Sequence, residues 1–158
     1  MITDSQAFAS VARIVPEDIP LTSFSILVAR QKGVLKDAVR AVHALRDVKP
    51  GDRVLVAEGC THDRTCNDIA TVKIPRWIDA MSGGAVEIET STGFDFPRDV
   101  SHVQAVLHCG GCMLNSQEMA HRRMVAHASG VPMTNFGLAI AFMHGILERS
   151  LNIFPELA

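Results

Sequence analysis

Apolar and polar residues follow two patterns along this chain, one typical of buried strands and the other of amphipathic helices. Short apolar runs bounded by turn-forming residues predict strands at 53–59, 85–90 and 103–108, with a further short strand at 131–134. Apolar residues spaced three and four positions apart predict helices at 4–14, 21–45, 68–82, 116–130 and 135–154. Gly33 interrupts the second of these helices, and Pro75 is a point where the third kinks or restarts.

The order of these elements predicts an α/β fold with one short parallel sheet. Strands that alternate with helices form βαβ units, whose right-handed crossovers place helices on both faces of the sheet. We therefore expect a Rossmann-like domain with three to four strands over residues 51–158, preceded by a helical segment over residues 1–50. The apolar helices of residues 21–45 predict either an association surface or packing on the sheet of the same chain.

Three of the four cysteines follow the predicted strands directly. Cys60 comes after the strand at 53–59, whereas Cys109 and Cys112 come after the strand at 103–108. Sites in open parallel sheets form outside the carboxyl ends of the strands. If these two strands are neighbours, the three thiols converge although they are distant in sequence.

Composition and charge limit the partners and the cellular compartment that we expect for a protein with this site. The 158 residues carry 15 basic and 17 acidic side chains without a basic run, which argues against a nucleic-acid partner. No apolar stretch is long enough to span a membrane, and the N-terminus lacks the pattern of a signal peptide. We therefore expect a cytoplasmic protein, in which cysteines bind metals or act chemically rather than form disulfides.

The three thiols suit either zinc or an iron–sulfur cluster. Zinc would take Cys60, Cys109 and Cys112 together with His62 or His108 in a closed Cys3His site. A [4Fe-4S] cluster would use the same three cysteines and leave its fourth iron for an exchangeable ligand. The residues alone leave both metals open.

Neighbouring residues add detail and one further alternative. Gly110 and Gly111 lack a Cβ, so the backbone can pass close to a bulky cluster and direct N–H groups at it. Cys66 is either an additional ligand or a free loop cysteine. A thioredoxin-like dithiol at Cys109 and Cys112 is the third interpretation, although it gives Cys60 no role.

The spacing of these residues is similar to the signature of a known family. Cys60-Thr61-His62, followed after a gap by the motif HCGGC at 108–112, resembles the CxH…HCxxC signature of HydF, the maturation GTPase of [FeFe]-hydrogenase. The segments LTSFSILVARQKG, KPGDRVLVAEGCTH, DIATVKIPRW, HCGGCMLN and GVPMTNFGLAIA resemble family segments in the same order. These residues contain no Gly-rich phosphate loop. The chain therefore resembles the cluster-binding domain with a remnant of the dimerisation domain, as an excised domain or a natural short homologue without GTPase activity.

The resemblance implies a scaffold rather than an enzyme, with no catalytic residues in this chain. It implies a [4Fe-4S] cluster held by Cys60, Cys109 and Cys112, with His62 and His108 close to an exchangeable fourth iron. It further implies that a homodimer receives a diiron subcluster precursor from radical-SAM maturases and delivers it to the apoprotein of [FeFe]-hydrogenase. Cys66 is not part of the three-cysteine signature.

Overall fold

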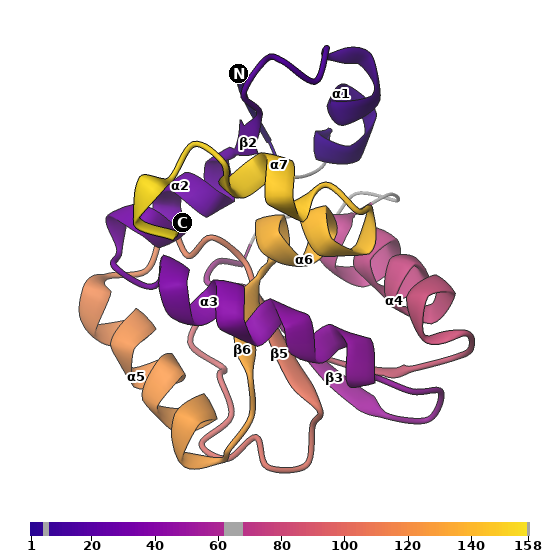
Figure 1. Cartoon of the computed structure of the whole chain (residues 1–158). Helices are drawn as coiled ribbons and strands as arrows, with labels where there is room; N and C mark the ends of the chain where they lie inside the picture. Colours follow the sequence, from indigo (N-terminus) through magenta and orange to yellow (C-terminus); the bar gives the residue numbers. More distant parts are fainter. Residues whose placement is uncertain (5–6, 62–67, 158) are drawn as a thin grey trace.

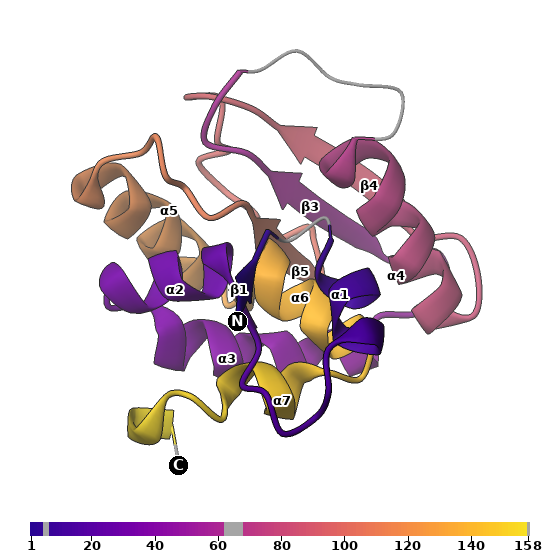
Figure 2. The same cartoon turned by 90° about the horizontal axis from the view of Figure 1, so that it is seen from above.

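A parallel sheet of four strands lies at the centre of the molecule (Figures 1 and 2). The computed structural model describes residues 1–4, 7–61 and 68–157. The order of the strands is β4-β3-β5-β6, and every neighbouring pair is parallel. Their bounds are β3 (Arg53–Ala57), β4 (Glu87–Ser91), β5 (Ala105–His108) and β6 (Met133–Asn135). The predicted α/β fold with a parallel sheet is confirmed.

The helices and the remaining strands have the following bounds. The α-helices are α1 (Phe8–Ile14), α2 (Phe24–Gln31), α3 (Leu35–Val42), α4 (Ile74–Ser82), α5 (Ser116–Ala128), α6 (Phe136–Met143) and α7 (Leu147–Leu151). The shorter helical turns are η1 (His43–Asp47), η2 (Ile69–Lys73) and η3 (Pro155–Leu157), of which η2 is a π-helix. Two very short strands, β1 (Ile2–Thr3) and β2 (Thr22–Ser23), form a separate parallel pair.

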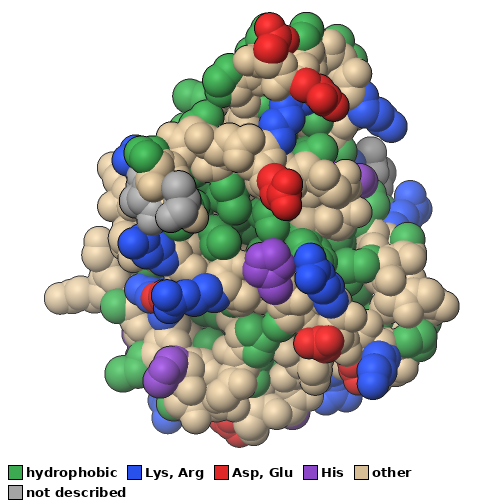
Figure 3. Space-filling view, in the orientation of Figure 1, with side chains coloured by type: hydrophobic (Ala, Val, Ile, Leu, Met, Phe, Trp, Pro, Cys, Tyr) green, Lys and Arg blue, Asp and Glu red, His purple; other side chains and the backbone are tan. Residues whose placement is uncertain are grey.

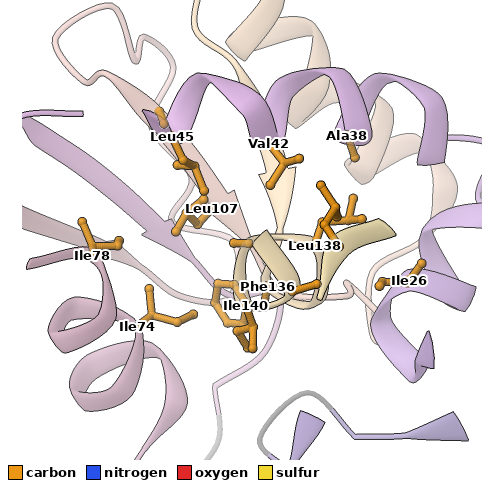
Figure 4. Close-up of a cluster of buried hydrophobic side chains, with 14 of the residues drawn as sticks. Ile26, Ala38, Val42, Leu45, Ile74, Ile78, Leu107, Phe136, Leu138 and Ile140 are labelled. Carbon is orange, nitrogen blue, oxygen red and sulfur yellow. The ribbon is translucent and has the colours of Figure 1, made fainter. Parts of the chain in front are cut away.

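The two central strands are buried on both faces, as their continuous apolar sequences predict. All four residues of β5 are buried, and β3 is buried from Val54 to Ala57. Helices α2, α3, α4 and α6 cover one face, and α5 covers the other (Figure 1). The first face carries a large apolar core in which Leu138 and Ile140 of α6 meet Val42 of α3 and Leu107 of β5 (Figure 4).

Local signals in the sequence set several helix ends. The carboxylate of Asp68 accepts hydrogen bonds from the backbone N–H groups of Ala70 and Thr71, which begins the predicted helix at its acidic end. Pro75 lies in the first turn of α4, directly after the π-helical turn η2, so the predicted helix changes its hydrogen-bonding pattern next to the proline. Gly83 ends α4 with a φ of +82°, a left-handed conformation that glycine adopts without strain.

Two predicted helices differ from the structure. The apolar spacing predicts a helix from residue 21, but Thr22 and Ser23 form β2, which pairs with β1. This pairing is non-local and too short to leave a periodic pattern in the sequence. The predicted terminal helix over 135–154 is divided into α6 and α7 because Gly145 adopts a φ of +71° between them. A left-handed residue cannot continue a right-handed helix.

The strand order indicates where a ligand site would form at the edge of this sheet. From β3 the chain moves to β4 on one side, and it then crosses to β5 on the other side of β3. In open α/β sheets the crevice at such a reversal is where ligands bind, because the two connecting segments leave in opposite directions. The reversal lies between β3 and β5, the strands that precede the cysteines.

Candidate metal centre

The cysteine loops leave the sheet side by side. Strands β3 and β5 are direct neighbours, with Ala57 opposite His108. The backbone N–H of Cys109 donates to the carbonyl of Ala57 at 2.8 Å, which extends the ladder to the first cysteine of the HCGGC motif. The structure therefore brings Cys60 to the same edge of the sheet as Cys109 and Cys112.

The thiol of Cys109 is the best-defined part of this site. Its Sγ accepts hydrogen bonds from the backbone N–H of Gly59 at 3.1 Å and from that of Gly111 at 3.3 Å. The two donors come from the two different cysteine loops. Backbone donors to a sulfur stabilise its thiolate form and are a recognised means of tuning a thiolate-bound metal. Cys109 thus already has the surroundings of a metal-binding thiolate.

The surroundings of Cys60 and Cys109 raise the pKa of both thiols. Burial raises the pKa of Cys60, and the nearby Glu58 and Cys112 act in the same direction. Burial also raises the pKa of Cys109, against the two N–H donors, which lower it. Cys60 thus interacts electrostatically with both other thiols. A bound metal would offset the repulsion between the thiolates, because its positive charge takes the place of the protons that the thiols release.

Exposure differs among the three cysteines and fixes the orientation of the site. Cys60 and Cys109 are half-buried, whereas Cys112 is exposed. The cavity behind Cys109 and Gly110 has a volume of about 40 Å³, room for only a few water molecules. A bulky group held by these thiols would therefore lie on the outer side of the loops, next to solvent.

The two glycines of HCGGC have distinct surroundings. Gly111 has a φ of +64°, and a Cβ there would stand 2.8 Å from the sulfur of Met119. A Cβ on Gly110 would meet Ser25 at an ordinary 3.5 Å. The turn and the contact with Met119 thus explain why residue 111 is glycine. Approach of this backbone to a cluster stays a prediction.

A lysine from α2 supports the second half of the loop. The ammonium of Lys32 donates to the carbonyl of Gly111 and, at 3.0 Å, to the carbonyl of Leu114. These two carbonyls bracket Cys112. The interaction connects the N-terminal helices to the cysteine loop over about 80 positions of sequence.

His108 lies behind the thiols with both ring nitrogens engaged. Nδ1 stands 2.7 Å from the carbonyl of Cys109, and Nε2 stands 2.9 Å from the Nη1 of Arg122. Because a carbonyl only accepts and a guanidinium only donates, the proton is assigned to Nδ1. Burial lowers the pKa of His108 to about 4, and the charge of Arg122 adds to this effect. In this arrangement His108 orients the Cys109 backbone and has no lone pair directed at a metal.

Two residues of the predicted site cannot be placed. His62 and Cys66 lie outside the described residues. Among residues 1–4, 7–61 and 68–157, no three His, Cys, Asp or Glu side chains are close enough to hold one metal ion, and these residues include Cys60, Cys109 and Cys112. The structure thus brings the three cysteines to one edge of the sheet without gathering their thiols around a single point.

Arg122 is a member of the site that the sequence interpretation missed. Its side chain is fully buried, and it contacts the ends of both cysteine-bearing strands. The signal was present in the spacing of α5, where Met119, Arg122 and Val125 occupy one buried stripe at intervals of three. An arginine on such a stripe requires buried acceptors for its N–H groups.

Comparison with models of protein families identifies the family of this chain. The model of the hydrogen maturase F tetramerization domain matches residues 36–153, and that of the hydrogen maturase F dimerization domain matches residues 1–33. The chain belongs to the HydF family. No curated protein matches the sequence.

The two matched HydF models describe self-association domains, which supports self-association of this chain. Neither of them is a GTPase domain. The boundary between them falls between α2 and α3, yet residues of both helices belong to the same apolar core.

On the face shown in Figure 3, basic side chains are interspersed with acidic ones. Within the described part of the chain, no helix is both long and apolar enough to cross a bilayer.

Proposed function

We propose that this chain is a scaffold that holds a [4Fe-4S] cluster through Cys60, Cys109 and Cys112 and carries a diiron precursor for hydrogenase maturation. The observation that carries the proposal is the meeting of the two cysteine loops at the β3–β5 reversal in a chain of the HydF family. The cluster would supply an iron whose fourth ligand exchanges, to which a precursor can attach.

The residues present fit such a group. Three thiols come from two loops, and two backbone N–H groups already point at the Cys109 sulfur. The exposure of Cys112 and the small volume behind Cys109 favour a group at the surface, reachable from solvent. A carrier requires this accessibility, because its cargo must enter and leave. His108 and Lys32 hold the loop backbone while the thiols bind the metal.

The two alternative chemistries fit less well. A structural zinc site is closed by a fourth permanent ligand, which would leave no open position for a cargo. The described side chains form no ready-made group around a single metal ion, and this holds for zinc and for iron alike. A reactive dithiol needs a lowered thiol pKa, usually at a helix N-terminus. Burial instead raises the pKa of Cys109, and α5 begins at Ser116, beyond both cysteines of the motif.

Anaerobic reconstitution tests the metal. The purified chain, incubated with ferrous iron and sulfide, is expected to become brown and to bind about four irons, with an EPR signal after reduction. Metal analysis of the protein as purified gives the competing outcome. A colourless chain with one zinc ion that cannot be replaced by iron would contradict the proposal.

Substitution of single cysteines tests the ligand set. Cys60→Ala, Cys109→Ala and Cys112→Ala are each expected to lose most of the iron, because each removes one of three anchoring thiolates. Cys66→Ala is the matched control and is expected to retain it. Loss of iron from the Cys66 variant alone would show that the assignment is wrong.

Delivery is a separate step and has a separate test. We propose that the chain acts as a homodimer that receives its cargo from radical-SAM maturases and passes it to apo-[FeFe]-hydrogenase. The loaded chain, incubated with the apoprotein, is expected to restore hydrogen evolution, and the Cys112→Ala chain is not. Light scattering measures the oligomeric state, and a monomer would contradict the dimer.

A further inference from the structure

A fully buried arginine lies beneath the cysteine loops. Arg122 projects from the middle of α5, with its guanidinium carbon 5.1 Å from the centre of the Phe96 ring. A buried charge is costly unless hydrogen-bond acceptors surround it. The hydrogen-bond acceptors of Arg122 therefore indicate which segments of the fold its side chain holds together.

Those acceptors lie in separate segments that meet at the metal centre. Nη1 donates to the carbonyl of Glu58 at 3.4 Å, two residues before Cys60. Nη2 donates to the carbonyl of Gly93 in the segment after β4. Nε donates to Glu118, one turn earlier on α5, at 2.7 Å. One side chain thus connects α5 with the ends of two strands.

The connection to the other cysteine loop runs through His108. Nη1 of Arg122 also donates to Nε2 of His108, and Nδ1 of His108 donates to the carbonyl of Cys109. Arg122 thereby fixes the main chain on both sides of the β3–β5 reversal. Only a planar group with several donors can span these acceptors, since a lysine ammonium offers its donors from a single point.

We propose that Arg122 is the positioning residue of the metal centre, holding the Cys60 loop and the Cys109–Cys112 loop side by side so that their three thiols can gather around a metal. It acts through the backbone of Glu58 and Cys109 and does not contact the metal. The inference rests on the proposed function for the identity of the metal, while its geometry concerns the thiols alone.

A titration of the metal-free chain with Co²⁺ tests this inference without an iron cluster. A single Co²⁺ ion has to draw the three thiols together, since they do not surround one point in the metal-free chain, and its affinity therefore depends on how well the two loops are held. Thiolate ligands give bound Co²⁺ a charge-transfer absorption, whose intensity reports how many thiolates bind. The Arg122→Lys chain is expected to bind Co²⁺ about 10- to 100-fold more weakly, the cost typical of removing a residue that orients metal ligands. The absorption per bound Co²⁺ is also expected to fall, because one thiol no longer reaches the ion.

The neighbouring Arg123 supplies a matched control. It lies on the same helix, is partly exposed and pairs with Asp37 of α3. Arg123→Lys is expected to bind Co²⁺ as the unmodified chain does. Circular dichroism and thermal unfolding of each variant identify any loss of the fold, and titrations are compared at a temperature where every chain is folded.

Arg122→Met, which also removes the charge, is expected to weaken binding further. If that chain does not fold, Arg122→Lys decides the question. A folded Arg122→Lys chain with unchanged Co²⁺ affinity and absorption would overturn the inference, because the thiols would then bind the ion equally well without the guanidinium group of Arg122.

The inference and the proposed function fail separately. If the unmodified chain binds Co²⁺ through three thiolates but assembles no iron–sulfur cluster, the proposed function fails while the role of Arg122 stands. If the cluster assembles and an iron chelator removes it equally fast from the unmodified and Arg122→Lys chains, the role of Arg122 fails alone.

Discussion

The two faces of the central sheet are built from different chemistry. On the face covered by α2, α3, α4 and α6, the core is a continuous set of mostly aliphatic side chains, with Phe136 among them (Figure 4) and with Phe8 and Phe154 in the same cluster. On the face covered by α5, the apolar cluster is small and includes Leu55, Val106 and Val125. Its end nearest the cysteine loops is polar, with Arg122 and His108 buried there.

This difference between the two faces suggests that one face supplies most of the stability of the fold and that the other positions the cysteine loops. Burial of aliphatic surface is the main favourable term in folding, so the first face should supply most of the stability. Buried polar groups contribute little net stability but accept only a few geometries. They lie where two loops must keep a fixed relative position. Four experiments test this division of labour.

The largest effect is expected from a cavity in the first face. Ile140 is fully buried in α6, so Ile140→Ala should lower the free energy of unfolding by about 2–5 kcal/mol. Urea unfolding of the metal-free chain measures this loss. Because Ile140 is remote from the polar cluster, the Co²⁺ affinity of the folded chain should not change. A parallel loss of affinity would show that the faces are not independent.

Acid should act mainly through the second face. Burial holds the pKa of His108 at about 4, against 6.5 without the fold, so the unfolded metal-free chain takes up this proton first. The contribution is complete above pH 6.5 and is lost as the pH falls toward 4, by up to about 3 kcal/mol.

Urea unfolding at several pH values measures this loss. His108→Gln should flatten the dependence, whereas His121→Gln, at an exposed position of α5, should leave it unchanged. A slope that persists in the His108→Gln chain would assign the acid sensitivity to other groups.

Lys32 tests whether the first face also acts on the site. Lys32→Met removes the two hydrogen bonds to the carbonyls of Gly111 and Leu114, which should cost about 1–2 kcal/mol in unfolding free energy. It should also weaken Co²⁺ binding, because Cys112 lies between those carbonyls. Lys36→Met, at an exposed position of α3, is the matched control. Unchanged binding in the Lys32 variant would restrict loop positioning to the second face.

The smallest effect is expected from the ion pair that joins helices of opposite faces. Asp37 of α3 pairs with Arg123 of α5, and both side chains are substantially exposed. Asp37→Asn should lower the free energy of unfolding by less than about 1 kcal/mol, since exposed pairs gain little over their solvated charges. Thermal unfolding at low and high salt measures it. A larger loss would mean that the two faces depend on this contact.

Much of the architecture could be predicted from the sequence because the decisive signals are local. The apolar runs around Val56 and Leu107 predicted buried strands, and Asp68 and Gly83 marked helix ends. Parallel pairing followed from the alternation of elements, and with it the position of the cysteines at strand ends. The pairing of β1 with β2 and the break at Gly145 were not predicted, since neither follows from hydrophobic periodicity.

The sequence by itself determined the α/β class, the placement of the HCGGC motif at the carboxyl end of a buried strand, and the similarity to HydF. Only the tertiary structure decided which strands are neighbours, and hence that Cys60 and Cys109 meet. It also decided that His108 faces Arg122, and that Lys32 reaches the backbone on both sides of Cys112. The physical reason is that periodicity reports which face of an element is buried. The partners of a buried polar group come from segments distant in sequence.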